Sequence, residues 1–444
     1  MIVSLAGIAL ALILILCFCN IRWGAACFLA YSILVPLSDI TVGGLHFGEN
    51  LVKTILLLSL LYDFKLRHHY KLSWKFFIPF FFYYLIELAI IPLQDETPTG
   101  WMYNNWRVSF MGTMFGAFVI YNVLKTYPKS LKLFRYSAIF SIIVAGVYGL
   151  FLTTTGGINP YIFDIVASTG SVSDAQDLMG YFSADDRMFG RISSVFMHPM
   201  SFGLFIGLAF IYVFAIRSKI KKWLFIALLL MLSLDALFCG VRSCIGGLVV
   251  AVAYYLIFSR NIKIGLVVLF VGIIGYNIIS TMPELSDYLG SIADIHNTQS
   301  NVRGSSIDMR LEQLNGCFKE IQRSPILGKG FGWVSYYKAN FGDHPVILAF
   351  ESLIFVVLCN NGILGLFIWA ILIYLVLRSN HRLKLKDKYV VDSLLVFYIT
   401  YSCITGEYGY MKYFLLFYIC MALENWNGEK NTNTNQIEIH HNRI

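Results

Sequence analysis

Long apolar runs, separated by short polar segments, follow one another along the sequence from residue 2 to about residue 424. The runs are continuously apolar, whereas a transmembrane strand would alternate between polar and apolar positions. Since about 17 to 25 apolar residues suffice for a helix to cross the hydrocarbon core of a bilayer, the pattern predicts membrane-spanning helices. The expected spans lie near residues 2–19, 23–38, 49–63, 76–94, 106–124, 137–155, 194–216, 223–238, 244–258, 264–280, 362–378, 390–405 and 411–424. Three of these runs are short, so we expect 12 or 13 spans in one all-α, polytopic membrane bundle.

The composition agrees with a chain that is embedded in a membrane over most of its length. Hydrophobic residues make up 57% of the 444 residues and charged residues only 14%, which excludes an ordinary soluble enzyme. We therefore expect one membrane domain over residues 1–424, followed by a polar cytoplasmic tail at 425–444. The formal net charge of +8 does not indicate a nucleic-acid partner, because excess Lys and Arg in membrane proteins lie mainly in cytoplasmic loops.

The distribution of these basic residues predicts the orientation of the chain. Basic loops alternate along the sequence with loops that contain few Lys and Arg residues. The basic loops are 64–75, 125–136, 217–222, 260–263 and 378–388, and the others are 94–100, 156–193 and 281–345. The positive-inside rule therefore places the basic loops in the cytoplasm and the two long loops outside.

One apolar stretch, residues 346–361, does not fit this alternation as a span. If it crossed the membrane, the basic loop 378–388 would lie outside. It also contains Glu351, whose charge is costly in lipid unless it faces protein or water. We expect a helix that lies at or dips into the outer face, followed by the true span from Ile363. The large helical external loop then covers residues 281–361.

Several arginines lie in segments that this topology places outside, against the usual charge bias. Guanidinium groups present a rigid fork of donors that matches phosphate oxygens, so several of them in one outer-leaflet pocket would suit a lipid-linked pyrophosphate. For each single arginine the alternative is a side chain that only reaches the membrane interface on its apolar stem. The candidates are Arg191, Arg242, Arg303 and Arg310.

Two histidines and one carboxylate could contribute proton-transfer chemistry. His344 precedes the expected surface helix, and an unperturbed histidine titrates near ~6.5, which suits a general base. Glu351 follows seven residues later on the same face of that helix. It could orient His344, act as the base itself or pair with an arginine, and His344 could instead be a capping or solvated loop residue. His198, beside Pro199 and about one turn inside its expected span, is expected to pack behind the site.

The sequence contains no phosphate-binding P-loop and no Asp-x-Asp pair. The usual metal clamp for a nucleotide-sugar donor is therefore missing, which favours a donor that needs neither a bound metal nor another cofactor.

Three stretches resemble the bacterial O-antigen polymerase and O-antigen ligase superfamily, over roughly residues 185–380. The first is "RISSVFMHPMSFG" (191–203), whose His-Pro pair stands where ligases more often have Asn-Pro. The second is "GVRSCIGGLVV" (240–250). The third is "DMRLEQLNGCFKEIQRSPILGKGFGW" (308–333), followed by "DHPVILAFESLIFVVLCNNGILGLF" (343–367).

The resemblance implies a metal-independent, inverting glycosyltransferase of the bacterial inner membrane whose site faces the periplasm. Its donor would be a glycan on undecaprenyl pyrophosphate. Arg191, Arg242 and Arg310 match the family's pyrophosphate-contacting arginines, and His344 matches its proposed base. The favoured activity is polymerisation of lipid-linked repeat units for O-antigen, capsular or other exopolysaccharide. The expected partners are the lipid-linked donor and acceptor, membrane lipid and a chain-length regulator.

Two other activities remain open at this point. An O-antigen ligase would move the glycan onto lipid A core. A lipid-glycan transporter or flippase should show internal repeats or charges near the middle of the membrane, and no repeat is visible. The possible exceptions are Lys53, Glu87, Asp235 and Asp392, which could also be residues at the ends of spans.

Overall fold

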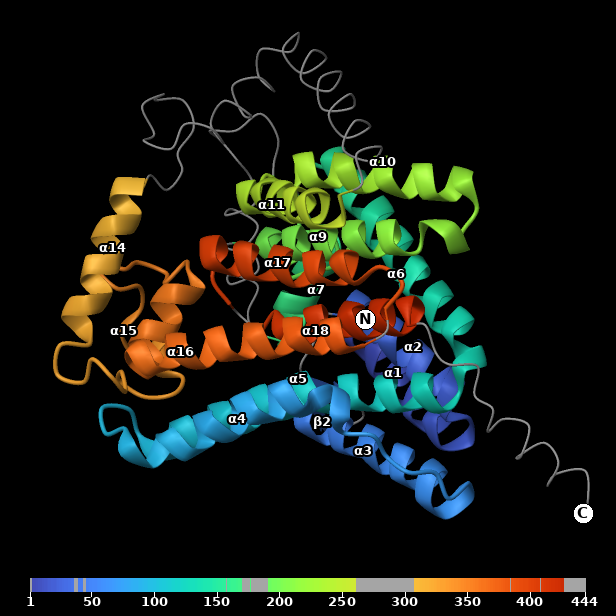
Figure 1. Ribbon diagram of the computed structural model, residues 1–444, viewed down its shortest axis with the longest axis horizontal. Helices are drawn as coiled ribbons and strands as arrows, with labels where there is room; N and C mark the ends of the chain where they lie inside the picture. Colours follow the sequence, from blue (N-terminus) through green and yellow to red (C-terminus); the bar gives the residue numbers. More distant parts are fainter. Residues whose placement is uncertain are drawn as a thin grey trace, which may run out of the picture.

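The computed structural model describes residues 2–35, 39–42, 45–156, 158–169, 176, 191–260, 307–383, 385–407 and 409–426. The expected span at 264–280 and Arg303 lie outside these described residues. Most of the described chain is helical, and Figure 1 shows the long helices packed alongside one another. The predicted all-α class of membrane fold is confirmed.

Each span that was expected within the described residues coincides with a helix. These helices are α1 (Ile2–Cys19), α2 (Ile21–Leu34), α3 (Glu49–Leu61), α4 (Ile78–Ile90), α5 (Thr99–Thr126), α6 (Leu131–Thr153), α9 (Pro199–Ala215), α10 (Lys222–Phe238), α11 (Arg242–Ser259), α16 (Leu353–Arg382), α17 (Lys388–Thr405) and α18 (Met411–Asn425). Among the described residues, six helices are long and apolar enough to cross a membrane: α1, α5, α11, α16, and α4 and α6 with the short turns that flank them. Since α2 and α9 are apolar but shorter, the count of 12 or 13 spans stays a prediction.

The connection between α2 and α3 differs from the expected span at 23–38. Helix α2 ends at Leu34, because the next residue, Val35, precedes a proline and adopts an extended conformation. The chain then forms a two-stranded antiparallel hairpin of β1 (Asp39–Val42) and β2 (Leu45–Gly48). The Gly-Gly pair between the strands is a common hairpin signal that the apolar pattern does not show.

Helix α9 lies at the centre of the bundle. Nearly all of its side chains are buried, and it packs against α10, α11, α17 and α18. A helix that is apolar on every face is one that its neighbours surround. The close approach of α17 requires a glycine, since a Cβ atom on Gly207 would lie 1.9 Å from Cζ of Phe397.

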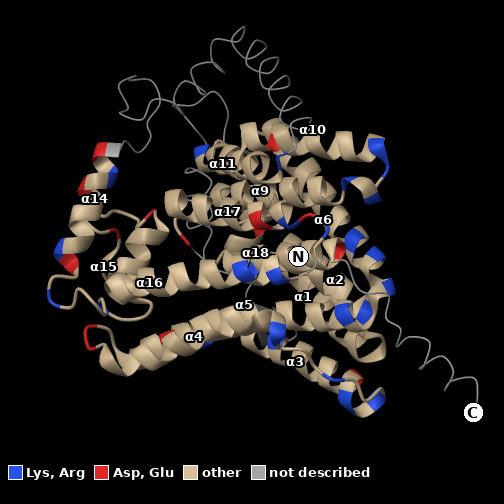
Figure 2. Ribbon diagram, in the orientation of Figure 1, with Lys and Arg blue, Asp and Glu red and all other residues tan. Residues whose placement is uncertain are grey.

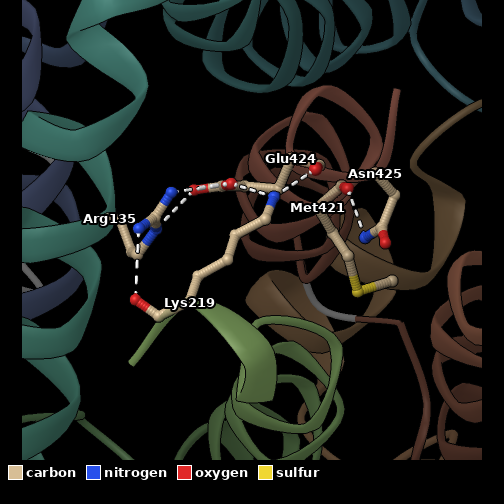
Figure 3. Close-up of polar contacts among 5 residues, drawn as sticks. All are labelled: Arg135, Lys219, Met421, Glu424 and Asn425. Atoms are coloured by element: carbon tan, nitrogen blue, oxygen red, sulfur yellow. Dashed lines mark hydrogen bonds and ion pairs between the residues drawn. The ribbon is translucent and has the colours of Figure 1, made fainter. Parts of the chain in front are cut away.

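The basic loops meet at one end of the bundle, as the charge alternation predicts. Figure 2 shows blue Lys and Arg segments gathered at the helix ends that lie away from α14 and α15. Within this end, Glu424 of α18 accepts hydrogen bonds from Arg135 of α6 at 2.7 Å and from Lys219, which follows α9, at 2.5 Å (Figure 3). The Glu424 side chain is 3% exposed, so a buried carboxylate pairs with both cations.

Helix α16 breaks at Gly362, which agrees with a span that starts at Ile363. Gly362 adopts φ 61° and ψ −157°, and the amides of Ile363 and Leu364 donate to the carbonyls of Pro325 and Ile326 instead of to their own helix. A Cβ atom on Gly362 would lie 2.5 Å from the Ile326 carbonyl oxygen, so only glycine fits there.

The segment before this break corrects one prediction. The surface helix begins at Leu353 and not at residue 346, because the Ser352 side chain accepts a hydrogen bond from the amide of Ile354 and caps the helix at that point. Residues 346–351 form a turn. Glu351 and His344 therefore do not share a helix face.

We predict that Glu424→Ala lowers the free energy of unfolding by roughly 3–5 kcal/mol, because Arg135 and Lys219 lose their buried counter-charge. Thermal unfolding of the protein in detergent, followed by tryptophan fluorescence, measures the effect. The control is Asp343→Ala, which removes an exposed pair with Lys338 at 3.8 Å and should change the stability by less than about 1 kcal/mol. Equal losses in the two variants would contradict the prediction.

Candidate functional site

The described part of the long loop that the charge pattern predicts to be external folds into a unit with its own small core. This outer unit, residues 307–361, contains α14 (Ile307–Glu320), α15 (Trp333–Phe341) and the first part of α16. Figure 1 shows α14 and α15 beside one end of the bundle, opposite the basic loops. Its buried apolar residues are Cys317, Ile321, Trp333, Val334, Ile347, Phe350, Phe355, Leu358 and Cys359.

The connection between α4 and α5 attaches the outer unit to the bundle. The Gln94 side chain donates to the carbonyl oxygen of Leu327 at 2.6 Å, and Thr97 donates to that of Lys329 at 2.8 Å. The side-chain amide of Asn361 donates to the buried carboxylate of Glu87 at 2.7 Å. The segment expected outside at 94–100 thus lies against the long external loop, as the predicted topology requires.

His344 holds a turn inside the outer unit. Its Nδ1 atom accepts the backbone amides of Val346 at 3.1 Å and Ile347 at 3.0 Å, so the proton of the neutral ring lies on Nε2. Nε2 lies 3.3 Å from Glu320, to which it donates. Both ring nitrogens are therefore occupied within the protein, which corresponds to the capping interpretation of this histidine.

Glu320 belongs to an ion cluster that the sequence reasoning missed. Its carboxylate accepts from Lys329 at 2.7 Å, and Lys329 also pairs with Glu96 at 3.3 Å. Although burial opposes it, the hydrogen bonds from Lys329 and His344 hold the pKa of Glu320 below its usual value. Glu96 lies in the segment 94–100, whereas Glu320 and Lys329 lie in the outer unit. The charge pattern could indicate this cluster only if these two separate segments were compared with each other.

Glu351 pairs with Arg310 and not with His344, which settles one of the alternatives for this carboxylate. Arg310 on α14 donates to the Glu351 carbonyl oxygen at 2.6 Å and lies 3.3 Å from its carboxylate. The same guanidinium donates to the carbonyl oxygen of Ile404 near the end of α17, at 3.2 Å. Glu351 keeps about a third of its side chain exposed, so Arg310 holds a solvent-accessible carboxylate at the end of the bundle.

The turn that carries Glu351 is strained. Leu348 and Phe350 both have φ near 57°, a left-handed conformation that side chains other than glycine rarely adopt. Each such residue costs on the order of 1–3 kcal/mol and persists only where its surroundings fix it. Here the His344 ring and the backbone bridge between His344 and Leu348 fix the turn.

His198 corrects a second prediction, since it does not lie inside its span. It is the residue before α9, and its Nδ1 atom accepts the amide of Met200 at 3.1 Å and caps the helix. Pro199 occupies the first helical position, where its missing amide proton is no loss. Burial and the nearby Arg191 guanidinium lower the pKa of His198 to about 4, so this histidine is neutral near pH 7.

Arg191 and Arg242 both lie near the turn that joins α10 and α11. The turn between α10 and α11 passes against Arg191, since a Cβ atom on Gly240 would lie 3.4 Å from its Cγ atom. Arg242 follows that glycine at the first position of α11. Ser243 next to it accepts a 2.5 Å hydrogen bond from Thr405, the neighbour of Ile404. The structure thus brings Arg191, Arg242 and the Arg310–Glu351 pair to neighbouring helix ends.

No group of three or more His, Cys, Asp or Glu side chains within the described ranges is placed to hold a metal ion. The residues that the structure adds to the predicted site are polar groups of helix ends and turns, such as Thr405 and Gln94. Single polar residues of this kind carry no signal in the sequence.

Residues 227–370 match a family model described as O-antigen ligase. The match contains Arg242, Arg310, His344 and Glu351, whereas Arg191 and His198 precede it. No curated protein matches the chain.

Proposed function

Residues 227–370 are similar to the O-antigen ligase family, and on that premise we propose that this multi-pass membrane protein polymerises lipid-linked oligosaccharide repeat units. It transfers the growing glycan from undecaprenyl pyrophosphate to a sugar hydroxyl of the next repeat unit, at the periplasmic face of the inner membrane. The observation that carries the proposal is the meeting of two arginines, Arg191 and Arg242, with the Arg310–Glu351 pair at the bundle end beside the outer unit.

Arg191 and Arg242 bind the pyrophosphate of the donor. Both are half-buried at helix ends, and the neighbouring His198 is neutral near pH 7 and so adds no competing positive charge. Negative charge develops on the pyrophosphate as it leaves. Preorganised guanidinium groups stabilise that charge more in the transition state than in the ground state.

Glu351 is the better of the two candidates for the general base. Its carboxylate is partly exposed, whereas both ring nitrogens of His344 are engaged inside the outer unit. Glu351 takes the proton of the acceptor hydroxyl, and the oxygen attacks the anomeric carbon while the bond to pyrophosphate breaks, with inversion. His344 positions Glu351 through the strained turn, and Arg310 does so by direct contact.

The ligase is the second candidate, because the family model is itself described as O-antigen ligase. In a ligase the acceptor would be lipid A core, and the same arginines and carboxylate would serve. Transport is less well supported. The buried charges Glu87, Asp235 and Asp392 lie close to helix ends, at positions typical of residues near the membrane surface.

We predict that the purified protein lengthens an undecaprenyl-pyrophosphate-linked repeat unit without added nucleotide or lipid A core, and in the presence of a metal chelator. The chelator is included because the sequence has no Asp-x-Asp pair to hold a metal ion. The measurement is the ladder of product lengths on a gel. Product that forms only when lipid A core is supplied would support the ligase, and loss of product in chelator would contradict metal independence.

Glu351→Gln should lower turnover by about 10²–10⁴-fold, the usual contribution of a positioned general base, at normal membrane abundance. The matched variant is His344→Asn, because an asparagine side chain can accept the amides two and three residues ahead and keep the turn. We therefore expect His344→Asn to retain most of the activity. The opposite result, with an active Glu351→Gln and an inactive His344→Asn, would assign the base to His344.

Arg191→Lys and Arg242→Lys should each lower activity on the order of tenfold to a hundredfold, because lysine lacks the guanidinium fork and a charged hydrogen bond contributes about 1.5–3 kcal/mol. Arg217→Lys is the control, since Arg217 lies at the basic end and donates to Phe214 there. Polymer length and rate in a null strain, at matched abundance, measure the effect. Full activity in both lysine variants would show that these arginines only reach the interface.

A further inference from the structure

Two cysteines lie together inside the outer unit. Cys317 lies on α14 and Cys359 lies on α16, three residues before the break at Gly362. Both side chains are fully buried in the core of the outer unit. Both therefore belong to the same small core, which α14 and α16 form by packing against each other.

The surrounding backbone also fixes this pair. The amide of Lys329 donates to the Cys359 carbonyl oxygen at 2.9 Å, while the Lys329 ammonium donates at 2.7 Å to Glu320, one turn after Cys317. On the other side of Cys317, a Cβ atom on Gly316 would lie 2.9 Å from Cγ1 of Val346. Lys329 thus links α14 to the Cys359 backbone, and Gly316 lets α14 approach the turn that precedes α16.

We propose that Cys317 and Cys359 form an intrachain disulfide in the mature protein, which closes the segment that carries His344 and Glu351. The proposal rests on the outward orientation in the proposed function, since disulfides persist in oxidising compartments such as the periplasm. Cys239 and Cys244 are also both buried, but they lie at the ends of two helices within the core of the bundle.

The chemistry is thiol–disulfide exchange. The oxidant is the disulfide of a thiol–disulfide oxidoreductase in that compartment. One cysteine thiolate attacks this disulfide and forms a mixed disulfide, which the second cysteine resolves. The S–S bond forms, the two cysteines lose two protons and two electrons, and the oxidoreductase leaves as a dithiol. Because both thiols are buried once the outer unit has packed, the exchange takes place while the loop folds.

The cross-link would hold the catalytic turn in place. Arg310 lies before Cys317 on α14. Glu351 lies before Cys359, in the segment that leads into α16. The bond therefore limits how far the two members of the Arg310–Glu351 pair can separate. We expect it to protect the strained turn from local opening and not to take part in the reaction.

The test uses the full-length chain with a site-specific protease sequence inserted after Asn340, an exposed residue between the two cysteines. Membranes are treated with N-ethylmaleimide to trap free thiols, cleaved and run on a non-reducing gel. We expect the two fragments to stay joined and to separate on reduction. Cys317→Ser and Cys359→Ser should each separate without reduction, whereas the control Cys403→Ser should stay joined.

Separation of the unreduced parent fragments would overturn the proposal. An Asn340→Cys variant, labelled from outside intact cells, distinguishes a failure of the proposed disulfide from a failure of the proposed function. If the label reacts and the fragments separate, the disulfide is wrong and the orientation stands. If the fragments stay joined but the protein makes no polymer, the proposed function fails and the disulfide stands.

Discussion

The break of α16 at Gly362 is the constraint on which the position of the outer unit depends. A helix interrupted within the molecule leaves amides without intrahelical partners, and here the carbonyls of Pro325 and Ile326 accept them. The same contact closes the Gly328 turn, where a Cβ atom would lie 2.5 Å from the Gly362 amide nitrogen. These backbone contacts thus fix how the outer unit, residues 307–361, meets the bundle, and the side chains of the candidate site follow from that placement.

Two ion clusters, one around a buried carboxylate and one partly exposed, lie at opposite ends of the molecule. At the basic end, Glu424 neutralises Arg135 and Lys219 between three helices. In the outer unit, Glu320 neutralises Lys329 and fixes the proton of His344 on Nε2. An unpaired charge in such surroundings would be strongly destabilising, so these clusters determine which helix ends can meet.

The apolar runs predicted nearly every described helix, since length and continuous apolarity are local properties of the sequence. The charge alternation also predicted which loops meet, because each loop contributes its own lysines and arginines. Neither pattern predicts which individual side chains pair with each other. The prediction that Glu351 would share a helix face with His344 failed because Ser352 caps the helix later than the apolar pattern suggests. The pairing of Glu351 with Arg310 depends on a contact between α14 and the α16 start that no spacing reveals.

The arginines that the predicted topology places outside can now be considered together. Arg310 is matched by Glu351, so its charge is compensated locally whether or not a substrate is present. Arg191 instead lies beside a histidine that its own charge and burial keep neutral. The turn between α10 and α11, whose Gly240 lies against the Arg191 stem, leads into Arg242 at the first position of α11. In the proposed function, the guanidinium forks of Arg191 and Arg242 bind a pyrophosphate together, because its charges lie on adjacent phosphorus centres.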